Sequence, residues 1–193
     1  PLSFSIYEIF KLLSGYSHVL WLDSDICIQD DISGILEHAS PVSIRHGGAP
    51  LRIALGRHIS PEMDLSPTNN TGVVLVRDDL PDYRDIHHDC YLYTQRFLET
   101  LNLPDQGIIN YTLWKHGIPI TDLTKDYNYT VYHAFHGYNK AKIFHLATDS
   151  KFWNHSVLRN LFPIWQDCYA QWLSLGGTAY AGEAIYPEIG DSF

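Results

Sequence analysis

The chain has 193 residues, of which 45% are hydrophobic and 13% aromatic. A chain of this length buries roughly 70% of its unfolded surface, so a core can form without cross-links, and disordered or collagen-like architectures are excluded. With 13 Lys and Arg against 22 Asp and Glu, the net charge is −9. Nucleic acid is therefore not an expected partner, because sequence-independent binding of phosphates depends on basic residues. No apolar run approaches the roughly 20 residues that span a bilayer, so no transmembrane segment is expected.

The cysteines indicate the compartment. Cys27, Cys90 and Cys168 are odd in number, far apart and free of any C-x-x-C pairing, which favours reduced thiols and a cytoplasmic protein. Peripheral association with the inner face of a membrane stays open. Asn-x-Ser/Thr triplets, which accept glycans in secreted proteins, occur at Asn69, Asn110, Asn128 and Asn154. We interpret them as coincidental, because two fall within motifs that are expected to be buried or catalytic.

The apolar pattern alternates between helix-like and strand-like spacing, which is typical of an α/β fold. A helix is predicted over residues 5–14, ending near Gly15. The continuous apolar runs at residues 18–22 and 72–76 predict strands covered on both faces. Shorter strands are expected at residues 41–45, 119–122 and 142–146, and helices at 83–101, 106–115 and 155–175, the last closed by Gly176 and Gly177.

The sequence opens on Pro1 and runs directly into the first predicted helix, so we interpret it as part of a longer protein. No internal repeat, low-complexity tract or Gly/Pro/Ser-rich linker divides it. Residues 1–193 are therefore expected to form a single domain.

Two carboxylates follow the strand predicted at residues 18–22. In open α/β sheets, ligands gather beyond the carboxyl ends of strands, where Asp23 and Asp25 lie. Two like charges so close repel one another unless a cation lies between them. Carboxylate oxygens favour Mn²⁺ or Mg²⁺, ions that commonly hold a diphosphate. The pair therefore predicts a divalent metal site, although a solvated turn or a helix N-cap would also suit these residues.

A competing chemistry uses a similar motif. Phosphohydrolases of the haloacid dehalogenase type also place Asp-x-Asp after a first strand, but they carry Thr or Val two residues later. This chain has Cys27 at that position, so the match is poor.

Four motifs occur in a characteristic order: residues 22–26 (LDSDI), 69–76 (NNTGVVLV), 103–106 (LPDQ) and 143–153 (IFHLATDSKFW). This order resembles glycosyltransferase family eight, which includes glycogenin and bacterial lipopolysaccharide galactosyl- and glucosyltransferases. The resemblance implies a Rossmann-like GT-A fold and a retaining transfer of a hexose from a nucleotide sugar to a saccharide acceptor. It also implies Mn²⁺ (or Mg²⁺) as cofactor and UDP-glucose or UDP-galactose as donor.

The resemblance assigns the metal ligands to Asp23, Asp25 and His145, with Asp23 also facing the ribose and diphosphate of the donor. Lys151 would neutralise a phosphate oxygen as the leaving group gains charge. The family's H-x-x-G-x-x-K-P-W motif is matched at His145, Lys151 and Trp153. It is not matched at Thr148 and Phe152, which replace its glycine and proline.

The remaining site residues follow from the same resemblance. Asn70 is expected to bind hydroxyls of the donor sugar, and Gly72 to give the backbone room there. Asp105 would orient the sugar, and the Gln106 amide would lie near the reacting face of the anomeric carbon. Gly107 stands where many relatives have another Asp. Taken singly, each of these residues also suits a turn, a helix cap or a packed core.

Because Gln106 is a weak nucleophile, we expect a front-face attack by the acceptor rather than a covalent glycosyl-enzyme. The family holds the nucleotide largely with segments upstream of the Asp-x-Asp pair, so the N-terminal part of the fold is expected to be missing. A non-catalytic carbohydrate- or partner-binding relative of the same fold is the alternative.

Two weaker features complete the analysis. His133 and His136 could bind zinc, with help from His87 and His88, but no third ligand is arranged near either pair. The aromatic-rich stretch at residues 127–138 could stack on a sugar face or serve as packing.

Overall fold

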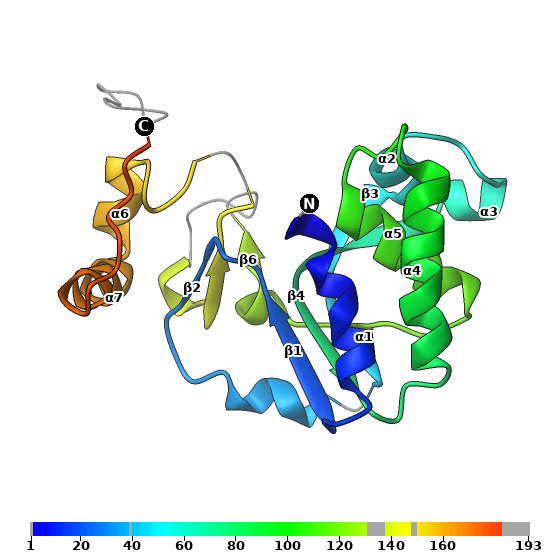
Figure 1. Cartoon of the computed structure of the whole chain (residues 1–193), viewed down its shortest axis with the longest axis horizontal. Helices are drawn as coiled ribbons and strands as arrows, with labels where there is room; N and C mark the ends of the chain where they lie inside the picture. Colours follow the sequence, from blue (N-terminus) through cyan, green and yellow to red (C-terminus); the bar gives the residue numbers. More distant parts are fainter. Residues whose placement is uncertain (1, 39, 131–137, 148–149, 183–193) are drawn as a thin grey trace.

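The structure is a computed structural model that describes residues 2–38, 40–130, 138–147 and 150–182 (Figure 1). Within these residues two small sheets lie between helices, which confirms the predicted α/β class. The pairs His133–His136 and Thr148–Asp149, and the tail from residue 183, lie outside the described residues.

The larger sheet has the strand order β1-β4-β3-β5. Its strands are β1 (His18–Leu22), β4 (Pro67–Arg77), β3 (Val42–Pro50) and β5 (Thr121–Asp122). Strand β4 pairs antiparallel with both β1 and β3, and β5 adds to β3 in parallel. Leu22 is paired with Val73, and the Asp23 N–H donates to the Gly72 carbonyl at 2.9 Å. The end of β1 is thereby fixed beside the glycine of β4.

The two apolar strands differ in burial. Val73 to Val76 of β4 are fully buried, as predicted for a strand covered on both faces. The same prediction is wrong for β1, whose residues from Val19 to Leu22 are only half-buried. The reason is position, since β1 pairs with β4 alone among the described strands and forms an edge of this sheet.

Helices cover one face of the larger sheet (Figure 1). They are α1 (Glu8–Leu12), which follows the 3₁₀ turn η1 (Leu2–Tyr7), α4 (Tyr83–Phe97) and α5 (Pro104–Lys115), with the short α2 (Leu51–Leu55) and α3 (Pro61–Asp64) beside them. Helix α5 begins two residues before the predicted start, because Pro104 is favourable in a first helical turn, where no N–H partner is needed. Asp105 and Gln106 therefore lie in that first turn.

The smaller sheet has the order β2-β7-β6. Strand β2 (Ile26–Ile28) pairs antiparallel with β7 (Ile143–His145), and β6 (Tyr129–Thr130) pairs with β7 in parallel. His145 lies opposite both Ile26 and Thr130. The sheet was only partly predicted, since just β7 had been expected as a strand. Short 3₁₀ turns occur at Ser33–Glu37 (η2), Lys125–Tyr127 (η3) and Tyr138–Lys140 (η5).

The described aromatic residues near β6 serve as packing. Tyr127 and Tyr129 are buried, and the Tyr129 ring stacks on Phe144 with centroids 6.2 Å apart. Because both tyrosines are buried, neither ring offers an exposed face on which a sugar could stack. Residues 131–137 of the same stretch lie outside the described residues.

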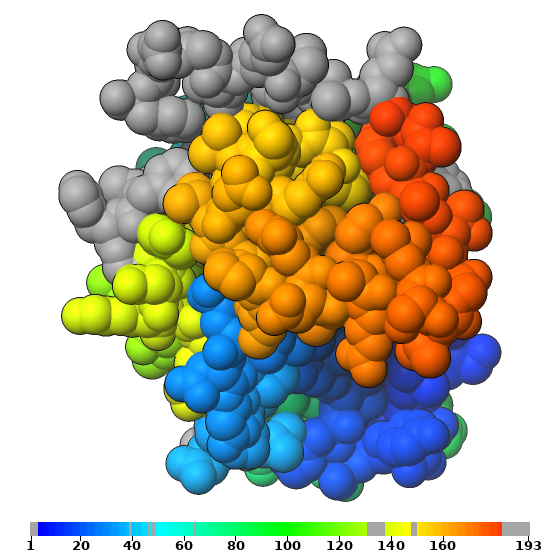
Figure 2. Space-filling model, turned by 90° about the vertical axis from the view of Figure 1, so that its left-hand side faces the viewer, coloured from blue at the N-terminus to red at the C-terminus, as the bar shows by residue number. Residues whose placement is uncertain are grey.

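The C-terminal segment contains two helices where one was predicted. Helix α6 (Ser156–Leu161) ends before Phe162, and α7 (Pro163–Ser174) begins at Pro163. A proline inside a helix lacks the N–H and clashes with the preceding turn, so the predicted helix divides there. Gly176 follows α7 with a φ of +90°, which confirms its predicted role in closing the helix. Figure 2 shows α6 and α7 covering the middle of one face of the molecule.

The C-terminal helices are attached to the smaller sheet by aromatic packing. Phe144, Phe152 and Phe162 are fully buried, and the rings of Phe144 and Phe162 lie 4.5 Å apart. Among the described helices, none combines the length and the apolar character needed to cross a membrane.

We expect Phe144→Ala to lower the free energy of unfolding by about 3–5 kcal/mol, because it leaves a cavity in this aromatic cluster. Urea denaturation followed by circular dichroism measures the change. The control is Leu65→Ala, at a side chain that is 83% exposed, for which about 0.5 kcal/mol or less is expected. Equal losses in the two variants would contradict the assignment of Phe144 to a core.

Candidate metal and substrate site

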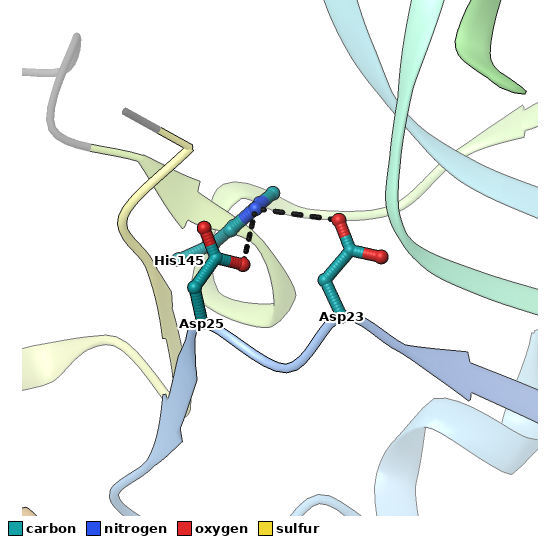
Figure 3. Close-up of side chains that lie close together, drawn as sticks. All are labelled: Asp23, Asp25 and His145. Atoms are coloured by element: carbon teal, nitrogen blue, oxygen red, sulfur yellow. Dashed lines mark ion pairs between the residues drawn. The ribbon is translucent and has the colours of Figure 1, made fainter. Parts of the chain in front are cut away.

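Three side chains at or beside the ends of separate strands converge at one point (Figure 3). Asp23 follows β1, Asp25 precedes β2, and His145 ends β7. His145 Nε2 lies 3.3 Å from Asp25 Oδ1 and 3.6 Å from Asp23 Oδ2. One ligand atom of each residue lies within 4.8 Å of the other two. The residues expected to share a metal ion are thus brought together, although 120 positions (145 − 25) separate His145 from Asp25.

Asp23 lies at the more open side of the cluster. Its Oδ1 accepts a hydrogen bond of 2.7 Å from the indole N–H of Trp21. Burial raises the pKa of Asp23, against the opposing effects of the Trp21 hydrogen bond and of His145, while Asp105 and Asp25 raise the pKa further. The ionised form of Asp23 is therefore disfavoured, and a cation nearby would stabilise it.

Asp25 is the more buried carboxylate and the better compensated one. Burial alone would raise the pKa of Asp25, but the interactions of its carboxylate with His145 and Lys151 outweigh burial and hold the pKa well below the ordinary value. The Lys151 ammonium forms an ion pair with Asp25 Oδ2, on the oxygen that does not face His145. Asp25 therefore stays ionised and offers Oδ1 to a cation.

The donor set fits a divalent cation. Two carboxylate oxygens and one imidazole nitrogen are ligands that Mn²⁺ accepts, and Mg²⁺ shares the preference for oxygen. The other ring nitrogen of His145, Nδ1, lies 3.0 Å from Asn128 Oδ1. Histidines that bind metal usually form such a hydrogen bond with the ring nitrogen that does not face the ion.

Two cavities meet at this cluster. The larger, of about 500 Å³, is lined by Trp21, Trp153 and Lys151, and the smaller, of about 190 Å³, by His145 and Gln106. Both are also lined by Asp23, Asp25 and Asp105. All residues predicted to act on the substrate or the metal line one cavity or both: Asn70, Gly72, Asp23, Asp25, Asp105, Gln106, His145 and Lys151.

Gly72 leaves the space that the His145 ring occupies. A Cβ atom at position 72 would overlap the imidazole. Gly72 was expected to leave room beside the backbone. In the structure, the His145 ring fills that room. The Gly72 N–H also donates to Asn70 Oδ1 at 3.1 Å, which fixes the Asn70 side chain at the edge of the smaller cavity.

The first turn of α5 carries Asp105 and Gln106 into the smaller cavity. Asp105 Oδ2 accepts a hydrogen bond of 2.8 Å from the hydroxyl of Thr71. The Gln106 amide accepts from Asn70 Nδ2 at 3.5 Å and donates to Thr68 Oγ1 at 3.3 Å. Both side chains are thus oriented by β4.

The structure also accounts for two residues that differ from the pattern of the family that the sequence resembles. Gly107 is buried where α5 meets α2, and a Cβ atom there would lie 3.1 Å from the backbone of Ala54. An Asp at that position would require the helices to move apart. Phe152, which replaces a proline, is a fully buried member of the aromatic cluster.

Sequence reasoning missed several residues that support the site, among them Thr71 and Asn128. Asn128 was noticed only as a glycan acceptor, yet it is fully buried, and Asn110 and Asn154 are also buried. Three of the four triplet asparagines therefore have internal positions, in agreement with the interpretation that the triplets are coincidental. His87, considered for zinc, pairs with Glu8 at 3.0 Å.

No protein-family model matches the sequence, and no curated protein is similar to it in sequence. Solved structures do match. The galactosyltransferase LgtC, in complex with donor and acceptor sugar analogs, has a TM-score of 0.58 and 15% identity, over 78% of this chain and 60% of LgtC. The chain has a GT-A glycosyltransferase fold.

Two further glycosyltransferase structures agree. GlyE of Streptococcus pneumoniae TIGR4 has a TM-score of 0.57 and 19% identity, over 93% of this chain and 48% of GlyE. Mouse xyloside xylosyltransferase 1 has a TM-score of 0.52 and 17% identity, over 77% of this chain and 63% of the mouse protein. The chain thus spans less than two thirds of each of these three proteins.

We expect Gly72→Ala to displace the His145 ring and to weaken Mn²⁺ binding at least about tenfold, the range found when the support of a metal ligand is lost. Isothermal titration calorimetry with MnCl₂ measures the affinity. Gly15→Ala is the control, because nothing lies closer than 4.0 Å to a Cβ atom there. Undiminished binding in Gly72→Ala would show that Mn²⁺ binding does not depend on this position of the His145 ring.

We expect Lys151→Gln to raise the pKa of Asp25, because the ion pair is lost while the burial that opposes ionisation remains. Titration of the Asp25 side-chain carboxyl by ¹³C NMR in metal-free protein measures the shift. The control is Lys11→Gln, which removes an exposed ammonium that pairs with Glu8 instead. An unshifted Asp25 would mean that Lys151 does not contribute to its ionisation.

Proposed function

We propose that the chain is the metal- and donor-binding part of a retaining glycosyltransferase, which moves a hexose from a nucleotide sugar to a saccharide acceptor. The observation that carries the proposal is the convergence of Asp23, Asp25 and His145 where two cavities meet. The fold supports it, since the matching structures are glycosyltransferases and LgtC binds donor and acceptor sugar analogs. The choice of UDP-glucose or UDP-galactose as donor rests on the sequence resemblance.

Asp23, Asp25 and His145 would hold Mn²⁺ or Mg²⁺. When bound, such an ion supplies Lewis-acid stabilisation of the departing diphosphate, worth several kcal/mol. Lys151 lines the larger cavity beside Asp25 and would direct its ammonium to a phosphate oxygen of the donor. The larger cavity is therefore proposed for the diphosphate side of the donor.

The smaller cavity is proposed for the transferred sugar. Asn70, Asp105 and Gln106 line it, and each is held by a hydrogen bond from or to β4. Asp105, fixed by Thr71, would accept hydrogen bonds from sugar hydroxyls and orient the ring. Asn70 would bind hydroxyls at the opposite edge.

The chemistry of Gln106 favours a front-face reaction. Retaining glycosidases use a carboxylate as nucleophile, whereas Gln106 is a neutral amide engaged at both its oxygen and its nitrogen. We therefore propose that the acceptor hydroxyl attacks from the side of the leaving phosphate, with Gln106 shielding the other face. A sugar trapped covalently on Gln106 or Asp105 would contradict this mechanism.

We expect the complete protein to bind UDP in a Mn²⁺-dependent manner, and Asp25→Asn to weaken that binding by about 100-fold or more, since a direct ligand counts for at least as much as a residue that only supports a ligand. Calorimetric titration of UDP with Mn²⁺, and again with EDTA, tests this. Asp167→Asn, an exposed position on α7, is the matched control.

Binding of UDP that is indifferent to Mn²⁺ and to Asp25→Asn would contradict the proposed function. Saccharide binding without any metal dependence would instead favour the alternative, a non-catalytic carbohydrate-binding relative. Release of UDP from UDP-glucose or UDP-galactose in the presence of Mn²⁺ separates turnover from binding.

A further inference from the structure

Asn128 lies between two residues of the site and is fully buried. Its Oδ1 is 3.0 Å from His145 Nδ1, and its Nδ2 is 2.9 Å from Asn70 Oδ1 and 3.4 Å from the Asn70 carbonyl. It therefore joins the histidine expected to bind the metal to the asparagine expected to bind the donor sugar.

Backbone groups fix the orientation of both amides. The Gly72 N–H can only donate, so the Asn70 atom that faces it is the oxygen Oδ1. The Asn70 carbonyl can only accept, so the Asn128 atom that faces it is the nitrogen Nδ2. Asn128 Oδ1 must then point to the imidazole of His145.

This orientation determines which nitrogen of His145 carries a proton. A side-chain amide oxygen only accepts hydrogen bonds, so Nδ1 of His145 is the protonated nitrogen facing Asn128. The other nitrogen, Nε2, is the one that faces Asp23 and Asp25. Its lone pair is then available to a cation in the direction of both carboxylates.

The ring is restrained on further sides. The backbone of β4 at Gly72 lies against the imidazole, so close that a Cβ atom would overlap it. The pairing of Thr130 with His145 places β6, which directly follows Asn128, along β7. Rotation of the imidazole about χ2 would break the hydrogen bond to Asn128 and turn Nε2 away from the carboxylates.

We propose that Asn128 is a positioning residue, which selects the Nδ1–H tautomer of His145 and aims Nε2 at a divalent cation held with Asp23 and Asp25. The proposal rests on the function proposed above. Through Nδ2, Asn128 also ties this imidazole to Asn70, so the metal ligand and the donor-binding amide are held in one hydrogen-bonded chain.

Two substitutions separate the parts of this role. Asn128→Leu keeps the branching at Cγ and the number of side-chain heavy atoms, but it neither accepts from Nδ1 nor donates to Asn70. Asn128→Asp keeps an acceptor for Nδ1 and loses the donor to Asn70, so it should rescue the metal site. Asn110→Leu is the matched control, because Asn110 is another buried asparagine with an amide bonded to β4, at Asn69, and it makes no contact with His145.

The first measurement uses Mn²⁺ alone as the probe. We expect calorimetry to show about 10–100-fold weaker binding in Asn128→Leu, as for other residues that hydrogen-bond a metal ligand. Binding within about threefold of the wild type is expected in Asn110→Leu, and Asn128→Asp is expected to bind Mn²⁺ more tightly than Asn128→Leu. Full affinity in folded Asn128→Leu, or a matching loss in Asn110→Leu, would overturn the proposal.

The second measurement needs neither metal nor activity, nor any variant. ¹⁵N NMR of the His145 ring, in metal-free wild type at a pH at which the ring carries a single proton, reports the tautomer. We expect the proton on Nδ1, and a proton on Nε2 instead would overturn the proposal even if Asn128→Leu does not fold. Absence of Mn²⁺ binding in the wild type would instead refute the proposed function, and the NMR result would still decide the role of Asn128.

Discussion

The site depends on the repulsion between two carboxylates that the fold holds close together. Asp23 and Asp25 approach the same imidazole nitrogen, at 3.6 and 3.3 Å. The opposite pKa shifts of the two, upward for Asp23 and downward for Asp25, show how unevenly the protein compensates them. His145 favours the ionised form of both carboxylates, and Lys151 pairs with Asp25. Asp23 receives in addition only one indole hydrogen bond, and Asp105 raises its pKa further. A cation beside Asp23 would favour the ionised form of this carboxylate.

The topology explains how such a costly arrangement is maintained. The segment from Asp23 to Asp25 crosses from an edge of the larger sheet to an edge of the smaller one, so each carboxylate is anchored by a different sheet. The hydrogen bond from the Asp23 N–H to Gly72 fixes one end, and the pairing of Ile26 with His145 fixes the other. Hydrophobic packing on both sheets, around Val74 in one and Phe144 in the other, supplies the stability that holds the charges together.

Local features of this structure could be predicted from the sequence, and long-range ones could not. The strand at His18 to Leu22 could be predicted because a short, continuous apolar run is typical of a strand. Asp23 and Asp25 are close simply because one residue separates them. His145 joined the site only through the order of the motifs, since its distance depends on the register of β2 and β7. Asn128 was missed because its position beside His145 depends on β6, the strand that follows it. That strand has only two residues and is too short to show a periodicity in the sequence. The edge position of β1 depends on strand pairing that a periodicity does not encode. The division of the last helix is different, since Pro163 is a local signal that the apolar periodicity alone did not take into account.

The remaining polar groups of the site are neutral, and this follows from the same electrostatic constraint. Asn70, Gln106 and Asn128 form a chain of amides in which each orientation is set by a backbone or hydroxyl partner on β3 or β4. A carboxylate in place of Gln106 would add a fourth negative charge to a cavity that already contains Asp23, Asp25 and Asp105. It would compete for the cation and raise the cost of ionising Asp23 further. An amide at position 106 avoids that cost, and it is also a weak nucleophile. Under the proposed function, the charge balance that favours cation binding and the preference for front-face attack over a covalent route through Gln106 would therefore have the same origin.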